Sequence, residues 1–406
     1  MLTATVKTGA RRALSNSRRT FSSTVYAWGT GDEGQLGLGE VSPSVLTGQY
    51  VEASPCVVEA LENQDVVHAS CGLVHSAVAT EDGRVLTWGK QGPFLGHNAG
   101  DGGKCLSPTV VEGDIKGVKV ASVSCGGGVT TALSKDGDLF SWGSGNTMMR
   151  GYNTLGLATK EDQPVPKQVL FGGTDEIKIT KINHGKNHAL ALGEDGEIWT
   201  WGRGKDGVLG LGGATDALEP FPVDFFLDID ATCVDIACGE AFSLALTDEG
   251  KVFAWGKNDR CQLGLGGGLS LDHYAAENLP QLVEGPLKDE KVVALGAGGS
   301  QALALTESGD VYFWGNKLWM EPHKMTALAE HHIVKVDCGS GYSAALSDAG
   351  QLFTWSRGGR TRFSGVLGHG TSGRFAQPEL VKALKNVPLK SIACGSRHVI
   401  AITGMP

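Results

Sequence analysis

Short apolar segments separated by tight turns recur along this chain. Residues 76–79 (Ser-Ala-Val-Ala) and 84–88 (Arg-Val-Leu-Thr-Trp) flank Asp82-Gly83, and the second segment places large side chains at every other position. Asp-Gly suits a tight β-turn with positive φ, so the pattern predicts a β-hairpin. The same hairpin recurs with its turn glycine at Gly83, Gly137, Gly196, Gly250, Gly309 and Gly350.

Two sequence marks frame each predicted hairpin. Its second strand ends in Trp-Gly, at Trp28, Trp88, Trp142, Trp201, Trp255 and Trp314, with Trp355-Ser356 as a seventh, degenerate copy. A second mark lies 17 residues earlier in six copies, at Cys71, Cys125, His184, Cys238, Ala297 and Cys338, each followed by Gly. A fixed offset in six copies identifies an internal repeat.

Two further marks complete the repeat. A proline suited to an edge strand follows each Trp mark, at Pro55, Pro108, Pro166, Pro220, Pro280, Pro322 and Pro378. A Leu-Gly element precedes the proline, most fully at residues 34–39 and 261–266. Each repeat therefore carries about four short strands, and seven such units predict an all-β, seven-bladed β-propeller.

The chain ends predict how the ring closes. Trp28-Gly29 has no Cys-Gly before it, and Cys394-Gly395 has no Trp-Gly after it. Residues 25–29 should therefore pair antiparallel with the strand that follows Cys394, so that the N- and C-terminal strands share one composite blade. Such pairing removes the exposed edges that an open sheet would present.

These motifs resemble a known repeat family. The succession C-G-x-x-H-[ST]-x-A-L, D-G, V-[YF]-x-W-G and G-Q-L-G-x-G is similar to the regulator of chromosome condensation repeat, over about residues 25–406. The resemblance implies a seven-bladed propeller closed by its termini. It also implies two kinds of activity, because members include interaction platforms and a nuclear factor that exchanges nucleotide on a GTPase.

Composition agrees with a folded repeat protein. The chain has 406 residues, 41% apolar, with 60 Gly and 14 Pro, which is too little Gly plus Pro for a low-complexity chain. A length of 406 alone would suggest two or three domains, but the repeats predict one propeller over residues 22–406. No apolar run approaches the roughly 18 residues of a spanning helix, so no integral membrane span is expected.

The N-terminal segment has a composition of its own. The first acidic residue is Asp32, and five cations precede it among many Ser, Thr and Ala: Lys7, Arg11, Arg12, Arg18 and Arg19. Residues 1–21 are therefore predicted to be a mitochondrial transit peptide cleaved after Phe21. Cleavage would leave 30 basic and 44 acidic residues, a charge of −14 that disfavours DNA binding. The alternative is a basic tail for nuclear import or nucleic acid.

Candidate chemistry is sparse. The nine Cys residues form no C-x-x-C pair. Five of them occupy the repeat position that Ala297 occupies in another copy. This substitution indicates that the position requires a small buried side chain rather than a metal ligand or a disulfide. The motif G-x-G-x-x-G at residues 29–34 and 202–207 lacks a following helix pattern. His184 and His188 fall in repeat slots and are expected to be structural. We therefore expect no catalytic group, no metal and no cofactor.

Two departures from the repeat are candidate partner sites. Only 24 residues separate Trp314 from Cys338, so that repeat lacks its Leu-Gly element, and its loop carries Trp319. Trp319 either contacts a partner or fills the gap. In the seventh copy, residues 357–363 are rich in Gly and Arg. Arg357, Arg360 and Arg362 are candidates for binding a phosphate or carboxylate group of a partner. The alternative is an ordinary solvated loop.

Together these observations favour a non-enzymatic interaction propeller in mitochondria, in the matrix or on the matrix face of the inner membrane. Its expected partner is a large protein complex, such as a respiratory complex or the RNA-containing ribosome, for which it would be a subunit or assembly factor. The alternative is guanine-nucleotide exchange on a small or dynamin-like organellar GTPase. Exchange needs no covalent catalyst, so missing catalytic motifs do not exclude it.

Overall fold

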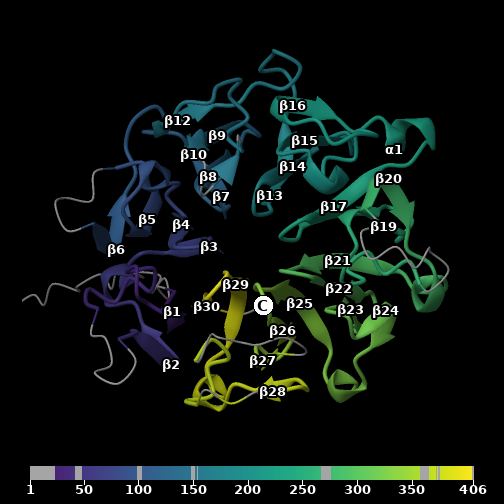
Figure 1. Ribbon diagram of the computed structural model, residues 1–406. Coiled ribbons are helices and arrows are strands. Elements are labelled where there is room, and N and C mark those ends of the chain that lie inside the picture. Colours follow the sequence, from purple (N-terminus) through teal and green to yellow (C-terminus); the bar gives the residue numbers. More distant parts are fainter. Residues whose placement is uncertain are drawn as a thin grey trace, which may run out of the picture.

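The chain forms a ring of seven four-stranded antiparallel sheets (Figure 1). The computed structural model describes residues 23–41, 48–97, 103–147, 151–152, 154–266, 276–356, 365–371, 373 and 375–404. The predicted seven-bladed, all-β propeller is confirmed.

The strands fall into four positions within a blade, numbered from the ring axis outwards. The innermost strands are β3 (Val66–Cys71), β7 (Val120–Cys125), β13 (Ile179–His184), β17 (Cys233–Cys238), β21 (Val292–Ala297), β25 (Ile333–Cys338) and β29 (Leu389–Cys394). The second strands are β4 (His75–Thr80), β8 (Val129–Ser134), β14 (His188–Gly193), β18 (Phe242–Thr247), β22 (Gln301–Thr306), β26 (Ser343–Ser347) and β30 (His398–Thr403).

The remaining strands complete the blades. The third strands are β5 (Val85–Lys90), β9 (Leu139–Gly143), β15 (Ile198–Gly202), β19 (Val252–Lys257), β23 (Val311–Gly315), β27 (Leu352–Trp355) and β1 (Val25–Thr30). The outer strands are β6 (Lys104–Val110), β12 (Gln163–Gln168), β16 (Ala217–Pro222), β20 (Ala276–Leu282), β24 (Trp319–Lys324), β28 (Glu379–Leu380) and β2 (Val51–Val57). We number the blades 1 to 6 from β3 to β28 and call the sheet β29-β30-β1-β2 the composite blade.

Short elements connect these strands. A small ribbon, β10 (Asn146–Thr147) and β11 (Gly151–Tyr152), follows β9. The helical turns are η1 (Glu59–Leu61), η2 (Pro93–Leu95), η3 (Lys205–Gly207), α1 (Phe225–Asp228), η4 (Gly285–Leu287), η5 (Thr326–Leu328) and η6 (Lys382–Leu384). Six of the seven marker prolines lie in an outer strand. An outer strand has no neighbouring strand on its solvent side, so a proline there, which lacks the N–H group, removes no hydrogen bond between strands on that side.

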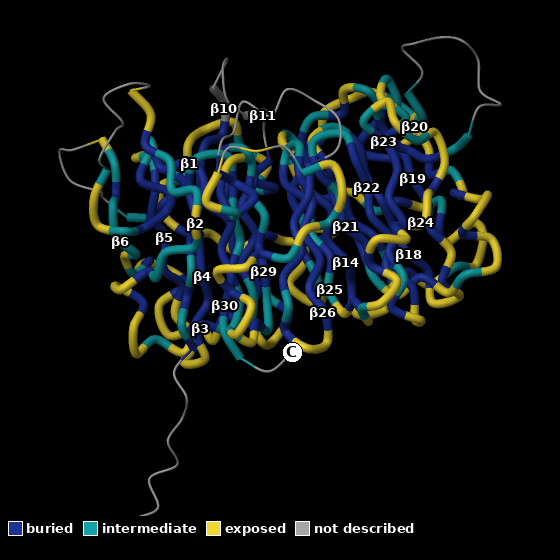
Figure 2. Tube along the Cα trace, turned by 90° about the horizontal axis from the view of Figure 1, so that it is seen from below, coloured by how far each residue is buried: buried dark blue, intermediate teal, exposed yellow. Residues whose placement is uncertain are grey.

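The strand directions give the ring two different ends. Each inner strand runs toward the end where the Cys-Gly marks and the Trp-Gly marks lie, which we call the mouth face. The hairpin turns lie at the opposite end, the turn face, where Gly83 adopts φ 91°. Seen from the side, buried residues fill the height of the blades and exposed residues gather at both ends (Figure 2).

The composite blade joins the two ends of the chain. β1 lies between β2 and β30 and pairs antiparallel with β30, with Val25 opposite Ile402 and Gly29 opposite His398. The residues just before β1 add two bonds: the Thr24 N–H donates to Thr403 Oγ1 at 2.7 Å, and the Val66 N–H donates to Ser23 Oγ at 2.8 Å.

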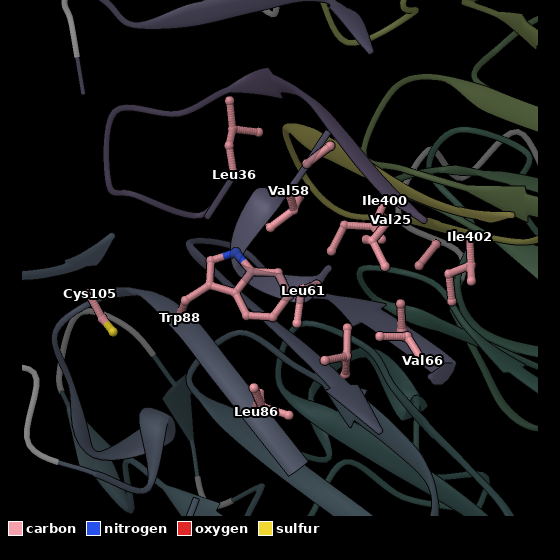
Figure 3. Close-up of a cluster of buried hydrophobic side chains, with 14 of the residues drawn as sticks. Val25, Leu36, Val58, Leu61, Val66, Leu86, Trp88, Cys105, Ile400 and Ile402 are labelled. Carbon is pink, nitrogen blue, oxygen red and sulfur yellow. The ribbon is translucent and has the colours of Figure 1, made fainter. Parts of the chain in front are cut away.

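Apolar cores lie between neighbouring blades rather than within one. In the core that joins the composite blade to blade 1, Trp88 lies among Val25, Leu36, Ile400 and aliphatic residues of β3 (Figure 3). All seven Trp residues of the repeat are fully buried. This burial explains why a large residue recurs at one position in every blade.

In every blade except blade 5, the Leu-Gly element covers the Trp of the next blade. The Trp88 Nε1–H donates to the Gln35 carbonyl at 2.9 Å, and Gly37 must be glycine because a Cβ there would come 2.7 Å from Trp88 Nε1. Equivalent bonds, from the Trp Nε1–H to a carbonyl of the preceding blade, join Trp28 to Val366, Trp201 to Thr154, Trp255 to Val208 and Trp314 to Gln262.

Blade 5 differs from the other blades only in the connection between its third strand, β23, and its outer strand, β24. Its sheet keeps four strands, and Trp319 lies in β24, not in a loop as the sequence suggested. A tight turn with Asn316 at φ 57° and Lys317 at φ 59° replaces the Leu-Gly element. Trp355 of blade 6 lacks that cover, and its buried Nε1–H has no hydrogen-bond partner among the described residues. The Nε1–H of Trp142 has none either, although Gly96 lies against it, so the cover alone does not guarantee the bond.

Candidate functional site

A channel along the ring axis opens at the mouth face. Its mouth, about 200 Å³ in volume, is lined by three consecutive residues from every blade. Those lining residues begin at Cys71, Cys125, His184, Cys238, Ala297, Cys338 and Cys394. The mark that identified the repeat therefore surrounds the channel.

The thiols at the mouth connect neighbouring blades. The Cys71 Sγ–H donates to the Ala393 carbonyl at 3.4 Å, and the Cys238 Sγ–H donates to the Asn183 carbonyl at 3.4 Å, each acceptor lying on the preceding inner strand. Burial raises the pKa of Cys125 to about 12, so it keeps its proton at neutral pH. Sequence reasoning gave this slot to small size alone; five cysteines in one slot were the signal for a thiol donor.

Buried histidines in the second strands also connect neighbouring blades. His75 Nε2 lies 2.8 Å from Thr130 Oγ1, and His398 Nε2 lies 2.7 Å from Ser76 Oγ. Burial lowers the pKa of both histidines to about 3, so they are neutral. The second contact joins the composite blade to blade 1. His188 makes the same kind of contact with the next blade, in agreement with the structural role expected for it.

His184 differs from these histidines. It lines the channel, and neither ring nitrogen has a hydrogen-bond partner among the described residues. Burial lowers its pKa to about 3. Within the described ranges, no three His, Cys, Asp or Glu side chains are grouped as metal ligands.

Charged side chains inside the channel also join inner strands. The channel interior has a volume of about 400 Å³. Asp337 Oδ2 accepts the Cys394 N–H at 2.7 Å, and Lys335 Nζ donates to Ser391 Oγ at 2.8 Å, both across one blade boundary. Burial raises the pKa of Asp337 and lowers that of Lys335. Lys181 forms an ion pair with Asp235 in the same way. These polar groups stiffen the ring.

A polar groove of about 570 Å³ adjoins the channel mouth on the mouth face. We call it the basic groove, because its lining carries five cations and three carboxylates: Lys186, Arg203, Lys205, Lys257 and Arg260 against Asp206, Glu240 and Asp259. The charged residues come from blades 3 and 4. Blades 5 and 6 contribute Gly299, Ser300, Asn316, Ser340 and Gly341 to its far side.

The repeat geometry brings these cations together. Lys186 follows the Gly mark of blade 3, whereas Arg203 and Lys257 directly follow the Trp-Gly marks of blades 3 and 4, so all three lie at the mouth face. The Arg203 N–H donates to the Asn187 carbonyl at 2.7 Å, and the Lys257 N–H donates to the Ala241 carbonyl at 2.9 Å. The backbone beneath the groove is therefore fixed. Sequence reasoning missed this site because its cations lie far apart in the chain.

The residues singled out from sequence are not all placed by the structure. Arg357, Arg360 and Arg362 lie outside the described residues. Ser356, directly before them, donates its hydroxyl to the carbonyl of Gly341, a groove residue, at 3.0 Å.

Trp319 packs against the apolar cores on both sides of blade 5 and stacks on His323, with ring centroids 3.8 Å apart. It is thus partly buried where the Leu-Gly element is missing, and its role in partner binding stays a prediction. In the described part of the chain, no helix has both the length and the apolar character to cross a membrane.

Comparisons with known proteins agree with this architecture. A family model described as RCC1-like domain matches residues 24–321, and one described as Regulator of chromosome condensation (RCC1) repeat matches residues 349–402. The solved structure of Prp20p from Saccharomyces cerevisiae superposes with a TM-score of 0.79 at 21% identity, covering 95% of this chain and 92% of that one.

Curated relatives extend the match. The chain is 31% identical over 401 residues to the human E3 ubiquitin-protein ligase HERC2, covering 95% of this chain but only 8% of that protein. It is 30% identical over 370 residues to the RCC1 domain-containing protein RUG3, mitochondrial, of Arabidopsis thaliana, covering 82% of this chain and 77% of RUG3. The chain belongs to the regulator of chromosome condensation (RCC1) repeat family.

Proposed function

We propose that this protein is a non-enzymatic interaction propeller of mitochondria, acting as a subunit or assembly factor of a large complex such as the ribosome or a respiratory complex. The observation that carries the proposal is its likeness to RUG3, a relative of similar extent whose name places it in mitochondria. The N-terminal composition supports the same compartment.

The transit peptide is the first testable part of this proposal. Residues 1–21 would be removed on import, leaving Ser22 at the new N-terminus. Cleavage at that point keeps Ser23 and Thr24, whose hydrogen bonds anchor β1. N-terminal sequencing of the protein from isolated mitochondria should start near Ser22. A nuclear protein that retains Met1 would contradict the compartment.

The structure supports a binding role through rigidity. Thiols, imidazoles and ion pairs join successive blades, so the loops of the mouth face are held on a stiff frame. Loops on a rigid scaffold are the usual place for recognition. Affinity purification of the tagged protein from isolated mitochondria, followed by mass spectrometry, should recover the subunits of one large complex in stable stoichiometry.

The proposed contact residues are Arg357, Arg360 and Arg362, with Trp319 as a weaker candidate. Changing the three Arg to Glu should weaken co-purification of an acidic or RNA-containing partner and alter its salt dependence. Unchanged co-purification of the folded variant would remove these residues from the site.

Nucleotide exchange on an organellar GTPase is the second candidate. It is favoured by the family match and by the likeness in fold to Prp20p, whose structure was described with its binding to Gsp1p and histones. Release of a fluorescent guanine nucleotide from mitochondrial GTPases, with and without the propeller, tests it directly. Acceleration of release would favour exchange over a purely architectural role.

A further inference from the structure

We propose that the basic groove binds an acidic peptide segment of a partner protein. This inference rests on the proposed interaction function and adds the chemistry of one contact. The groove is the largest of the cavities described above, and it lies on an otherwise acidic chain of formal charge −9. A local excess of cations on an acidic protein selects a ligand of negative charge and steers its approach.

The groove keeps cations available for such a ligand. Two of its five cations are neutralised internally, since Lys186 Nζ lies 2.6 Å from Glu240 Oε1 and Lys257 Nζ lies 3.0 Å from Asp259 Oδ2. Lys205 and Arg260 are both exposed, and neither forms an ion pair with a described residue. They come from blades 3 and 4 respectively, so a ligand between them would touch two blades.

One carboxylate of the groove, that of Asp259, is held in place in its charged form. Burial raises the pKa of Asp259, but the Lys257 ammonium and the Gln262 amide outweigh it, so the pKa lies below its usual value. Gln262 also accepts the Arg260 N–H at 2.8 Å. This network fixes the course of the backbone at Arg260. The groove is thus organised before a ligand arrives, which lowers the entropic cost of binding.

The lining favours a peptide over a nucleic acid. Acidic groups stand among the cations, and side-chain amides and hydroxyls supply both donors and acceptors, as a peptide backbone requires. Among the described lining residues, the imidazole of His188 is the only aromatic ring, and burial keeps it neutral with its pKa near 4. Nucleic-acid grooves use stacked aromatics and a continuous basic track instead.

The test uses the full-length chain and a fluorescein-labelled decapeptide rich in glutamate. The groove variant is Lys205→Glu with Arg260→Glu. The matched control is Lys288→Glu with Lys385→Glu, which makes the same charge change at two exposed lysines beside η4 and η6 on the turn face. Both variants keep the basic N-terminal residues, so any contribution of those residues is the same in each.

Fluorescence anisotropy at two salt concentrations should show that the groove variant binds the peptide at least about tenfold more weakly than the wild type, or about 1.4 kcal/mol. The control should change binding by less than about twofold. The groove variant should also gain affinity for a lysine-rich decapeptide, a charge swap that mere loss of structure would not produce. Equal weakening in both variants would overturn the proposal, as would absent peptide binding or tighter binding of a single-stranded RNA decamer.

Co-purification from mitochondria separates this inference from the function on which it rests. If the groove variant recovers the whole complex while the peptide fails to bind the wild type, the groove assignment is wrong and the interaction function stands. If the peptide binds as expected but no complex co-purifies with the wild type, the groove stands as an acidic-peptide site and the proposed complex is wrong.

Discussion

Removal of β1 should destabilise the ring far more than removal of the residues before it. The comparison is between a chain lacking residues 1–21 and one lacking residues 1–30. The shorter deletion keeps Ser23 and Thr24 and their bonds to β3 and β30. The longer one removes the strand that lies between β2 and β30 and leaves two sheet edges unpaired.

The magnitude follows from the side chains that β1 buries. Trp28 is 0% exposed within the core of blade 6 and the composite blade, and its Nε1–H donates to the Val366 carbonyl at 2.8 Å. Loss of a buried Trp costs about 3–5 kcal/mol. Val25, 1% exposed, adds about 2 kcal/mol. The sum of about 5–7 kcal/mol approaches the whole stability of many proteins, about 5–15 kcal/mol.

Thermal unfolding followed by circular dichroism measures this difference. Deletion of residues 1–21 should leave the midpoint nearly unchanged. Deletion of residues 1–30 should lower it by at least about 10 °C, at roughly 2 °C per kcal/mol, or abolish the cooperative transition. Cooperative unfolding of both chains at the same midpoint would refute the closure of the ring by its ends.

Three further predictions concern the contacts between blades. Trp314→Phe should cost about 1 kcal/mol more than Trp355→Phe in urea unfolding, because only Trp314 donates its Nε1–H to a carbonyl; equal costs would contradict the assignment. Cys125, whose pKa is about 12, should resist a thiol reagent in the native protein and react on denaturation, as mass spectrometry of labelled peptides would show. His75 and His398 have folded pKa values of about 3, below the unfolded 6.5, so below pH 6.5 the unfolded state binds more protons. Stability should therefore fall from pH 6.5 toward pH 3, by up to about 1.4 kcal/mol per pH unit for each, and a flat urea midpoint over this range would contradict it.

The ring itself was predictable because each mark of the repeat meets a local structural requirement. Trp88 marks a core between blades, and Gly37 marks the close approach of the Leu-Gly element to that Trp. These structural requirements recur from blade to blade, so the spacing of the marks is enough to locate the residues that meet them. Blade 5 shows the limit of this reasoning. The short interval after Trp314 correctly indicated a missing element, but it did not reveal that a tight turn at Asn316 keeps four strands in the sheet.

The candidate site was much less predictable than the fold. Lys205 and Arg260 belong to different repeats, and each is an ordinary exposed cation in sequence. Their proximity depends on the angle between two blades, which no local pattern encodes. The hydrogen bond from the Cys71 thiol to the Ala393 carbonyl could not be predicted for the same reason, because its acceptor is a backbone carbonyl 322 residues away.

The composite blade also sets the order of events during synthesis. Thr24 and Thr403, which hydrogen-bond across β1 and β30, are 379 residues apart. At about 5–20 residues per second, a ribosome needs roughly 20–75 s to make the chain between them. Throughout that interval β1 can pair with β2 but not with β30, which has not yet been made. Among the described strands of the ring, the first to be made must wait for the last, so the edge of β1 that pairs with β30 stays open until the end of synthesis.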